Sequence, residues 1–239
     1  MYAVLRSEKI KFFSFGWCIL GIIGAAIVPL LYLLTSDTPK IGGDKELLYL
    51  CLQALYLGQL GIVVASAGYF GQEYSYSSLR TTLLTQPARI KLLCTKFMTI
   101  TIIVVITGIF SSVLSLIVLS FQHDIEWTSS LILELFGSVF LVLLNWIQLA
   151  WIASTISIMP KSMITPIAIM LPLILGLGQM FFMLTQLVKF LPTLATMNLF
   201  TIPTVNIYLD KWLGLAVQFS WAVLLFTISA WLFLYRNVR

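Results

Sequence analysis

The sequence has little charge and few of the residues that catalysis or metal binding requires. Only 10% of its 239 residues are charged, against roughly 25% in an ordinary soluble domain. It has one histidine, His123, and three cysteines with no CxxC or Cys/His spacing. We therefore expect no metal centre and interpret the cysteines as small apolar side chains. Paired carboxylates and an HExxH motif are also missing, so the sequence predicts no enzyme active site.

The sequence also lacks a phosphate-binding loop. Such a loop needs the pattern G-x-x-x-x-G-K-[ST], in which backbone amides surround the phosphates and the lysine pairs with them. The segment 42–45, GGDK, does not have this spacing. We therefore expect no ATPase in this chain and no cofactor of its own.

Apolar residues are abundant: they make up 60% of the chain and form long uncharged runs. A helix needs about 20 residues to cross a hydrocarbon core roughly 30 Å thick. Six runs reach this length, so the predicted fold class is an all-α polytopic membrane protein with one transmembrane domain, 1–239. The predicted spans are 12–34, 47–71, 97–121, 134–159, 163–187 and 212–235. The first run follows basic residues but exceeds the roughly 7–15 apolar residues of a cleaved signal, so we expect it to be retained.

The distribution of lysine and arginine predicts the orientation, because these residues are retained in the cytoplasm. With both termini inside, ten of the 14 lysines and arginines lie in inner segments. The four in outer segments are Lys40, Lys45, Lys189 and Lys211. We therefore expect cytoplasmic N- and C-termini.

Three segments outside the spans have an unusual composition. Residues 1–11 favour an amphipathic helix at the inner surface, with a frayed basic terminus as the alternative. The inner loop 72–96 has leucines at helical spacing before Pro87, which ends the pattern. This predicts a short surface helix that contacts a partner, with a plain interfacial linker as the alternative. The outer segment 188–211 is too apolar for an exposed loop, and we expect it to enter the outer leaflet as a re-entrant helical hairpin.

A few polar and small residues interrupt the predicted spans. Neutral polar residues there most often form hydrogen bonds between helices, worth about 0.6 kcal/mol each. A second interpretation is that Asn145 and Gln148, close together on one span, line a substrate path. Gly58 and Gly61 predict close helix packing. We expect Glu134 at headgroup level, near the outer end of the fourth span.

The loop between the second and third predicted spans carries a recognisable motif. Its matching residues are Glu73, Leu79, Pro87, Arg89 and Lys96, and Ser77 and Ser78 stand where a glycine and a threonine are usual. With this motif and this order of spans, the chain resembles the permease subunits of ABC-2-type ATP-driven exporters. The resemblance is to the small six-helix form that serves peptide and drug export and immunity.

The resemblance implies a dimer of permeases, identical or sister chains, in which each copy docks a cytoplasmic ABC ATPase through a coupling helix. ATP and Mg would be bound by the ATPase subunits. The coupling residues that it implies are Glu73, Ser77, Ser78, Leu79, Arg80, Pro87 and Arg89. The expected function is export of an amphipathic or hydrophobic substrate, such as an antimicrobial peptide, drug or lipid, across a bacterial plasma membrane.

Two other functions remain open from the sequence. One is an ATP-independent transporter or channel, which would need coupling ions and an ionisable site near mid-membrane. The other is a non-transporting membrane immunity or sensor protein. The sequence does not distinguish a permease homodimer from a heterodimer, and it does not identify the substrate.

Overall fold

The computed structural model describes residues 2–35, 44–75, 82, 88–122 and 127–235, and no β-strand occurs among them. The long helices are α1 (Tyr2–Ser14), α2 (Gly16–Thr35), α3 (Asp44–Ser75), α5 (Arg89–Gln122), α6 (Ser129–Ile158), α7 (Ile164–Pro172) and α9 (Lys211–Tyr235). The short elements are a π-helical turn η1 (Leu173–Leu177), α8 (Gly178–Met180) and the 3₁₀ turns η2 (Phe181–Met183), η3 (Gln186–Phe190) and η4 (Met197–Leu199). Six helical stretches are long and apolar enough to cross a membrane. The predicted all-α class with six spans is therefore confirmed.

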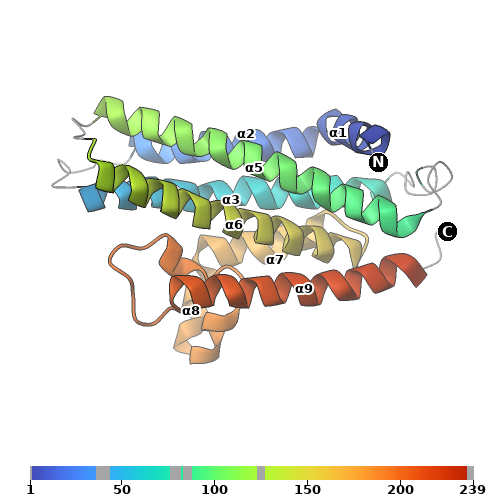
Figure 1. Ribbon diagram of the computed structural model, residues 1–239. Helices are drawn as coiled ribbons and strands as arrows, with labels where there is room; N and C mark the ends of the chain where they lie inside the picture. Colours follow the sequence, from blue (N-terminus) through green and yellow to red (C-terminus); the bar gives the residue numbers. More distant parts are fainter. Residues whose placement is uncertain (1, 36–43, 76–81, 83–87, 123–126, 236–239) are drawn as a thin grey trace.

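The spanning helices lie side by side, with α3 at the centre of the bundle (Figure 1). Helix α3 packs against α2, α5, α6 and α7, and it is the most buried of the six spans. Helix α9 packs mainly against α6. Helix α1 and the C-terminal end of α9 lie at one end of the bundle, and the segment that precedes α9 lies at the other (Figure 1).

Helices α2 and α3 approach closely because small residues face each other. A Cβ atom added at Gly61 would lie 2.3 Å from the backbone nitrogen of Ala25 and from the carbonyl oxygen of Gly21. One added at Gly21 would lie 2.5 Å from the backbone nitrogen of Ala65. Side chains of this small size let two backbones come into direct contact inside a membrane. The predicted packing role of Gly61 is therefore confirmed.

A second close contact surrounds Trp146 of α6, which is fully buried. A Cβ atom at Gly58 of α3 would lie 2.8 Å from its indole ring, and one at Gly108 of α5 would lie 3.3 Å from it. The ring therefore fills the space that these two glycines leave between α3, α5 and α6. This confirms the packing role predicted for Gly58.

The fifth span is interrupted rather than continuous. After Pro172, the chain passes through the η1 turn, where Gly176 has a φ of 120°, a conformation that side chains other than glycine rarely adopt. The following α8 segment projects from the bundle (Figure 1). Its neighbours Leu175 and Met183 are exposed, as residues that face lipid would be. The depth of the predicted re-entrant segment in a membrane stays a prediction.

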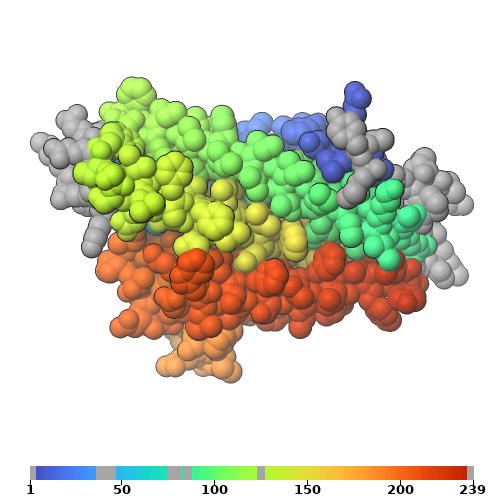
Figure 2. Space-filling view, viewed as in Figure 1, coloured from blue at the N-terminus to red at the C-terminus, as the bar shows by residue number. Residues whose placement is uncertain are grey.

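Large apolar side chains remain exposed along the outward faces of the bundle. They include Leu20, Ile23, Ile27 and Leu31 on α2 and Ile106, Phe110, Val113 and Ile117 on α5. Helices α5, α6 and α9 form one continuous face, beyond which the region of α8 projects (Figure 2). Lipid tails are the solvent that such an apolar surface requires, since water would penalise its exposure.

Candidate functional site

A buried cluster of opposite charges lies where α1, the end of α3 and the start of α5 meet. The Nζ atom of Lys96 lies 2.9 Å from the Glu8 carboxylate and 3.0 Å from the Glu73 carboxylate. All three side chains are at least 95% buried. Lys11 completes this cluster, and these four residues, Glu8, Lys11, Glu73 and Lys96, are called the ion network below.

Lys11 connects the ion network to the loop between α3 and α5. Its ammonium lies 3.1 Å from Glu8, one turn earlier on α1, and 3.6 Å from Glu73 on α3. It also donates a hydrogen bond of 2.9 Å to Oγ1 of Thr82. The contact with Thr82 places the ion network directly beside the loop that joins α3 to α5.

Aromatic rings enclose the buried charges. The Tyr69 hydroxyl donates a 2.7 Å hydrogen bond to Glu8, and the Lys96 ammonium lies 4.3 Å from the centroid of the Tyr69 ring. Phe12, one turn after Glu8 on α1, packs against the same ring with centroids 5.3 Å apart. A cation over an aromatic face is attracted to it, and the rings also exclude water from the ion pairs.

The ion network is electrically balanced, with two carboxylates and two ammonium groups. Charges are removed from water at a cost of several kcal/mol per ion, and close partners are required to offset it. Burial by itself raises the pKa of the Glu8 carboxyl, but the charge and hydrogen bond of Lys96, the Tyr69 hydroxyl and Lys11 together outweigh it. The pKa of Glu8 therefore lies below its usual value, and the carboxyl is ionised at neutral pH.

The ion network bears directly on the predicted coupling loop. Ser77, Ser78, Leu79, Arg80 and Pro87 lie outside the described residues. Glu73 lies just before them, and its carboxylate is buried against Lys96 and Lys11 of the same chain. Lys96 lies on α5, after the loop. The two ends of the loop are thus joined by an ion pair, and a contact of Glu73 with an ATPase stays a prediction.

Arg89 links the same loop to the last helix. It is the first residue of α5, and its guanidinium donates hydrogen bonds of 2.8 Å to the Leu234 carbonyl and 3.3 Å to the Phe233 carbonyl. These carbonyls belong to the last turn of α9, where the helix dipole favours a cation. A displacement of the start of α5 would therefore also reach the end of α9.

A separate chain of buried polar groups crosses the middle of the bundle. Asn145 of α6 donates to Gln59 of α3 over 3.2 Å, and its own side-chain oxygen accepts from Gln218 of α9 over 2.9 Å. Gln218 in turn accepts a 3.0 Å hydrogen bond from Thr196. All four side chains are almost fully buried. The role in hydrogen bonds between helices that is expected of neutral polar residues in the spans is confirmed for Gln59 and Asn145.

Gln148 differs from its neighbour Asn145. Its side chain is half-buried, and its Oε1 atom has no hydrogen-bond partner among the described residues. The two residues proposed for a substrate path therefore have different surroundings. Asn145 bonds to two other helices, whereas the Gln148 side-chain oxygen is enclosed without a hydrogen-bond partner among the described residues. The substrate path itself stays a prediction.

Sequence reasoning did not identify several members of these two clusters. Glu8 and Lys11 belong to a segment that predicts a surface helix, Tyr69 belongs to an apolar span, and Gln218 is one polar residue in the last span. The spacing of Glu8 and Lys11 by three residues was the only local signal, and such pairs are common on exposed helices. The motif included Lys96, but only the fold shows that it meets Glu73.

A family model described as "ABC-2 family transporter protein" matches residues 7–178. This range includes every member of the ion network and the first five spans up to the start of α8. No curated protein and no solved structure matches the chain.

Proposed function

Because the chain belongs to the ABC-2 transporter family, we propose that this multi-pass membrane protein is the permease subunit of an ATP-driven exporter. Family membership identifies it as a membrane transport component. We propose in addition that it exports its substrate and that a separate ATPase subunit drives this export. The segment between α3 and α5 would be the contact with the ATPase, and the ion network would transmit its movement.

The observation that carries this proposal is the ion pair between Glu73 and Lys96 at the base of the loop. A force applied to residues 76–87 acts on the ends of α3 and α5, and these ends are held together by buried charges. Breaking a buried ion pair by removing one partner costs about 3–5 kcal/mol, so this contact resists separation of the two helices. The two helix ends therefore respond as one unit.

The remaining contacts extend that unit. Glu8 ties α1 to it through Lys96, and Arg89 ties the end of α9 to it. Four helices would thus follow one movement of the loop. Such an arrangement suits a subunit in which ATP-driven closure of a cytoplasmic partner must change the packing of several spans.

The proposed assembly contains two permeases, identical or sister chains, and two copies of a cytoplasmic ABC ATPase that bind ATP and Mg. The proposed location is a bacterial plasma membrane. The proposed cargo is amphipathic or hydrophobic, such as an antimicrobial peptide, a drug or a lipid. The central polar chain is uncharged, and this supports cargo without fixed charge; its members are Gln59, Asn145, Thr196 and Gln218.

The test is a mild-detergent pull-down of the tagged chain from its native membranes, followed by mass spectrometry of the bound proteins. We expect a stoichiometric ABC ATPase, which Leu79→Asp and Arg80→Glu remove. Lys91→Gln is the matched control, because Lys91 is exposed on α5 and outside the ion network.

Two results would contradict the proposal. If no ATPase is recovered under conditions that preserve other membrane complexes, an ATP-independent transporter or a sensor becomes the better account. If the ATPase is recovered equally with Leu79→Asp, Arg80→Glu and the parent chain, the contact lies elsewhere.

A further inference from the structure

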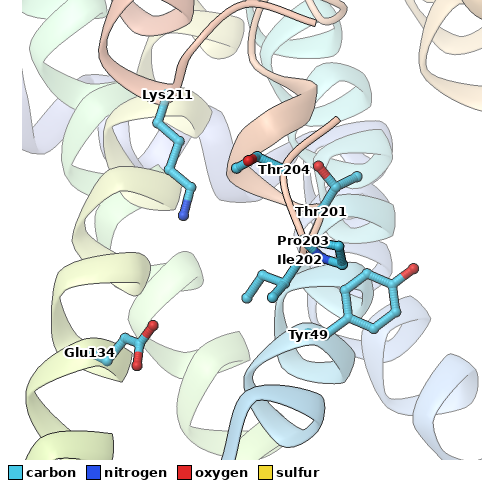
Figure 3. Close-up of a pocket in the computed structure, with 7 residues that line it drawn as sticks. All are labelled: Tyr49, Glu134, Thr201, Ile202, Pro203, Thr204 and Lys211. Atoms are coloured by element: carbon cyan, nitrogen blue, oxygen red, sulfur yellow. The ribbon is translucent and has the colours of Figure 1, made fainter. Parts of the chain in front are cut away.

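A pocket of about 680 Å³ opens at the end of the bundle opposite to α1. It lies between the start of α6, the start of α9, α3 and the segment before α9 (Figure 3). Its lining residues are Tyr49, Glu134, Thr201, Ile202, Pro203, Thr204 and Lys211. The ion network and the central polar chain contribute no residue to this pocket.

Two opposite charges face the pocket from different helices. Glu134 is exposed on the first turns of α6, and Lys211 is half-buried at the first position of α9. Figure 3 shows the Lys211 side chain extending into the opening and the Glu134 carboxylate on its other side. Neither forms an ion pair with a described residue. The wall of the pocket thus carries a negative side chain and a positive side chain that do not contact each other.

Asp210, the acidic residue that precedes Lys211, is already engaged elsewhere. The carboxylate of Asp210 accepts a hydrogen bond from the backbone N–H of Trp212 at 3.3 Å, so it caps α9, and it does not line the pocket. Thr204 adds a hydroxyl group to the wall, whereas the hydroxyl groups of Tyr49 and Thr201 bond to Gln53 and Asn198. Among the lining residues that the structure describes, a ligand meets one negative group, one positive group and neutral polar surface.

The surroundings place this pocket at the level of lipid headgroups. Trp127 and Trp212 stand just before α6 and at the start of α9, and both are at least half exposed. Exposed tryptophans at the ends of spans are typical of the membrane–water interface. Leu133 and Phe136, next to Glu134 on α6, are 76% and 73% exposed and continue the apolar surface toward the middle of the membrane.

We propose that this pocket binds the zwitterionic headgroup of a membrane phospholipid, with its amine at Glu134 and its phosphate at Lys211. A headgroup of this class carries one cation and one anion, which matches the separated charges of the pocket. Its acyl chains would follow the exposed apolar residues of α6. The proposal goes beyond the transport function and does not depend on an ATPase.

The test uses native mass spectrometry of the purified full chain in detergent, with phosphatidylethanolamine and phosphatidylglycerol added separately. We expect phosphatidylethanolamine to bind about fivefold more tightly than phosphatidylglycerol, because its amine makes one additional, partly exposed charge contact with Glu134. Glu134→Gln removes this preference, whereas Lys211→Gln weakens both lipids about fivefold. Lys189→Gln is the matched control: Lys189 is also half-buried and lies beside the Phe190 ring, outside the pocket.

Thermal unfolding of each variant shows whether it is folded, because these partly exposed positions tolerate loss of charge. Equal binding of the two lipids by the parent chain, or an equal loss in Lys189→Gln, would overturn the proposal. Soluble competitors show whether the pocket recognises a lipid headgroup or a peptide that carries both a free amine and a free carboxylate. Glycerophosphoethanolamine should displace bound phosphatidylethanolamine and dialanine should not; displacement by dialanine alone would assign the pocket to a peptide zwitterion and refute the lipid site.

Discussion

The ammonium group of Lys96 lies 2.9 Å from the carboxylate of Glu8, and both side chains are about 99% buried. This pair joins the first helix of the chain to the start of α5. Because Lys96 also lies 3.0 Å from Glu73, one buried cation contacts two acids from different helices. The contact makes α1 part of the same structural unit as the proposed coupling loop.

Lys96→Met should destabilise the protein by about 3–5 kcal/mol, because it leaves two buried carboxylates with Lys11 as their one cation in the ion network. The measurement is thermal unfolding in detergent. Lys91→Gln on the exposed face of α5 is the control and should change stability by less than about 0.5 kcal/mol. The double variant Glu8→Gln with Lys96→Met should be less destabilised than the sum of its single variants, since Glu8→Gln removes one of the two carboxylates that the loss of Lys96 leaves short of a cation. Additive effects would argue against the pairing.

Stability should fall in acid through Glu8. Its pKa is below the usual value of 4.5, because Lys96 and its other partners outweigh burial. A carboxyl with a lowered pKa stabilises the fold above its unfolded pKa, and this contribution is lost as the pH falls below 4.5 toward the folded pKa. Thermal midpoints between pH 7 and pH 3.5 should therefore drop less steeply in Glu8→Gln than in the parent chain. Identical slopes for Glu8→Gln and the parent would contradict this role.

Gly61→Ala should push α2 and α3 apart, because the added methyl group would lie 2.3 Å from backbone atoms of Gly21 and Ala25. We expect a loss of about 1–3 kcal/mol, as for other overpacked sites. The matched control is Gly24→Ala, whose added carbon would have its nearest neighbour at 3.9 Å. Thermal unfolding of both variants provides the measurement, and equal stability would mean that this close approach is not needed.

Gln218→Leu should lower the stability of the protein, whereas Gln148→Leu should not. Gln218→Leu removes the donor to Asn145, so we expect a loss of about 1–3 kcal/mol from a buried acceptor without a partner. Gln148→Leu removes an acceptor that has no partner among the described residues, so the isolated protein should keep its stability. If Gln148 faces the substrate path, its variant should nevertheless reduce transport in reconstituted vesicles. Wild-type transport by a stable Gln148→Leu protein would remove it from the path.

Arg89→Gln should show whether Arg89 is needed for binding of the ATPase or for coupling movement of the loop to α9. The change removes the hydrogen bonds to the last turn of α9 and a favourable interaction with the helix dipole, together worth about 1 kcal/mol. We expect the ATPase still to be recovered with this variant, but its stimulated ATP hydrolysis to decrease. Arg80→Glu, in contrast, should lose the ATPase itself. Loss of the ATPase from Arg89→Gln would instead place Arg89 at the docking contact.

Much of the fold could be predicted from local features of the sequence. Uncharged runs of about 20 residues must be helical to cross a bilayer, because every backbone polar group has to be satisfied within the segment. The same argument gave the number of spans, and the small residues around Gly61 indicated a close helix contact. The interruption of the fifth span at Gly176 was not predicted, since a glycine in an apolar run has no unique conformation.

The sequence by itself determined the membrane class, the six spans, the lack of a nucleotide-binding loop and the motif that pointed to the ABC-2 family. These properties depend on composition and on residues close together along the chain. Only the tertiary structure decided that Glu73 and Lys96 meet Glu8, that Asn145 joins Gln59 to Gln218, and that Glu134 and Lys211 share one pocket. Such contacts depend on the rotation and register of helices against one another, and the period of a single helix does not specify them.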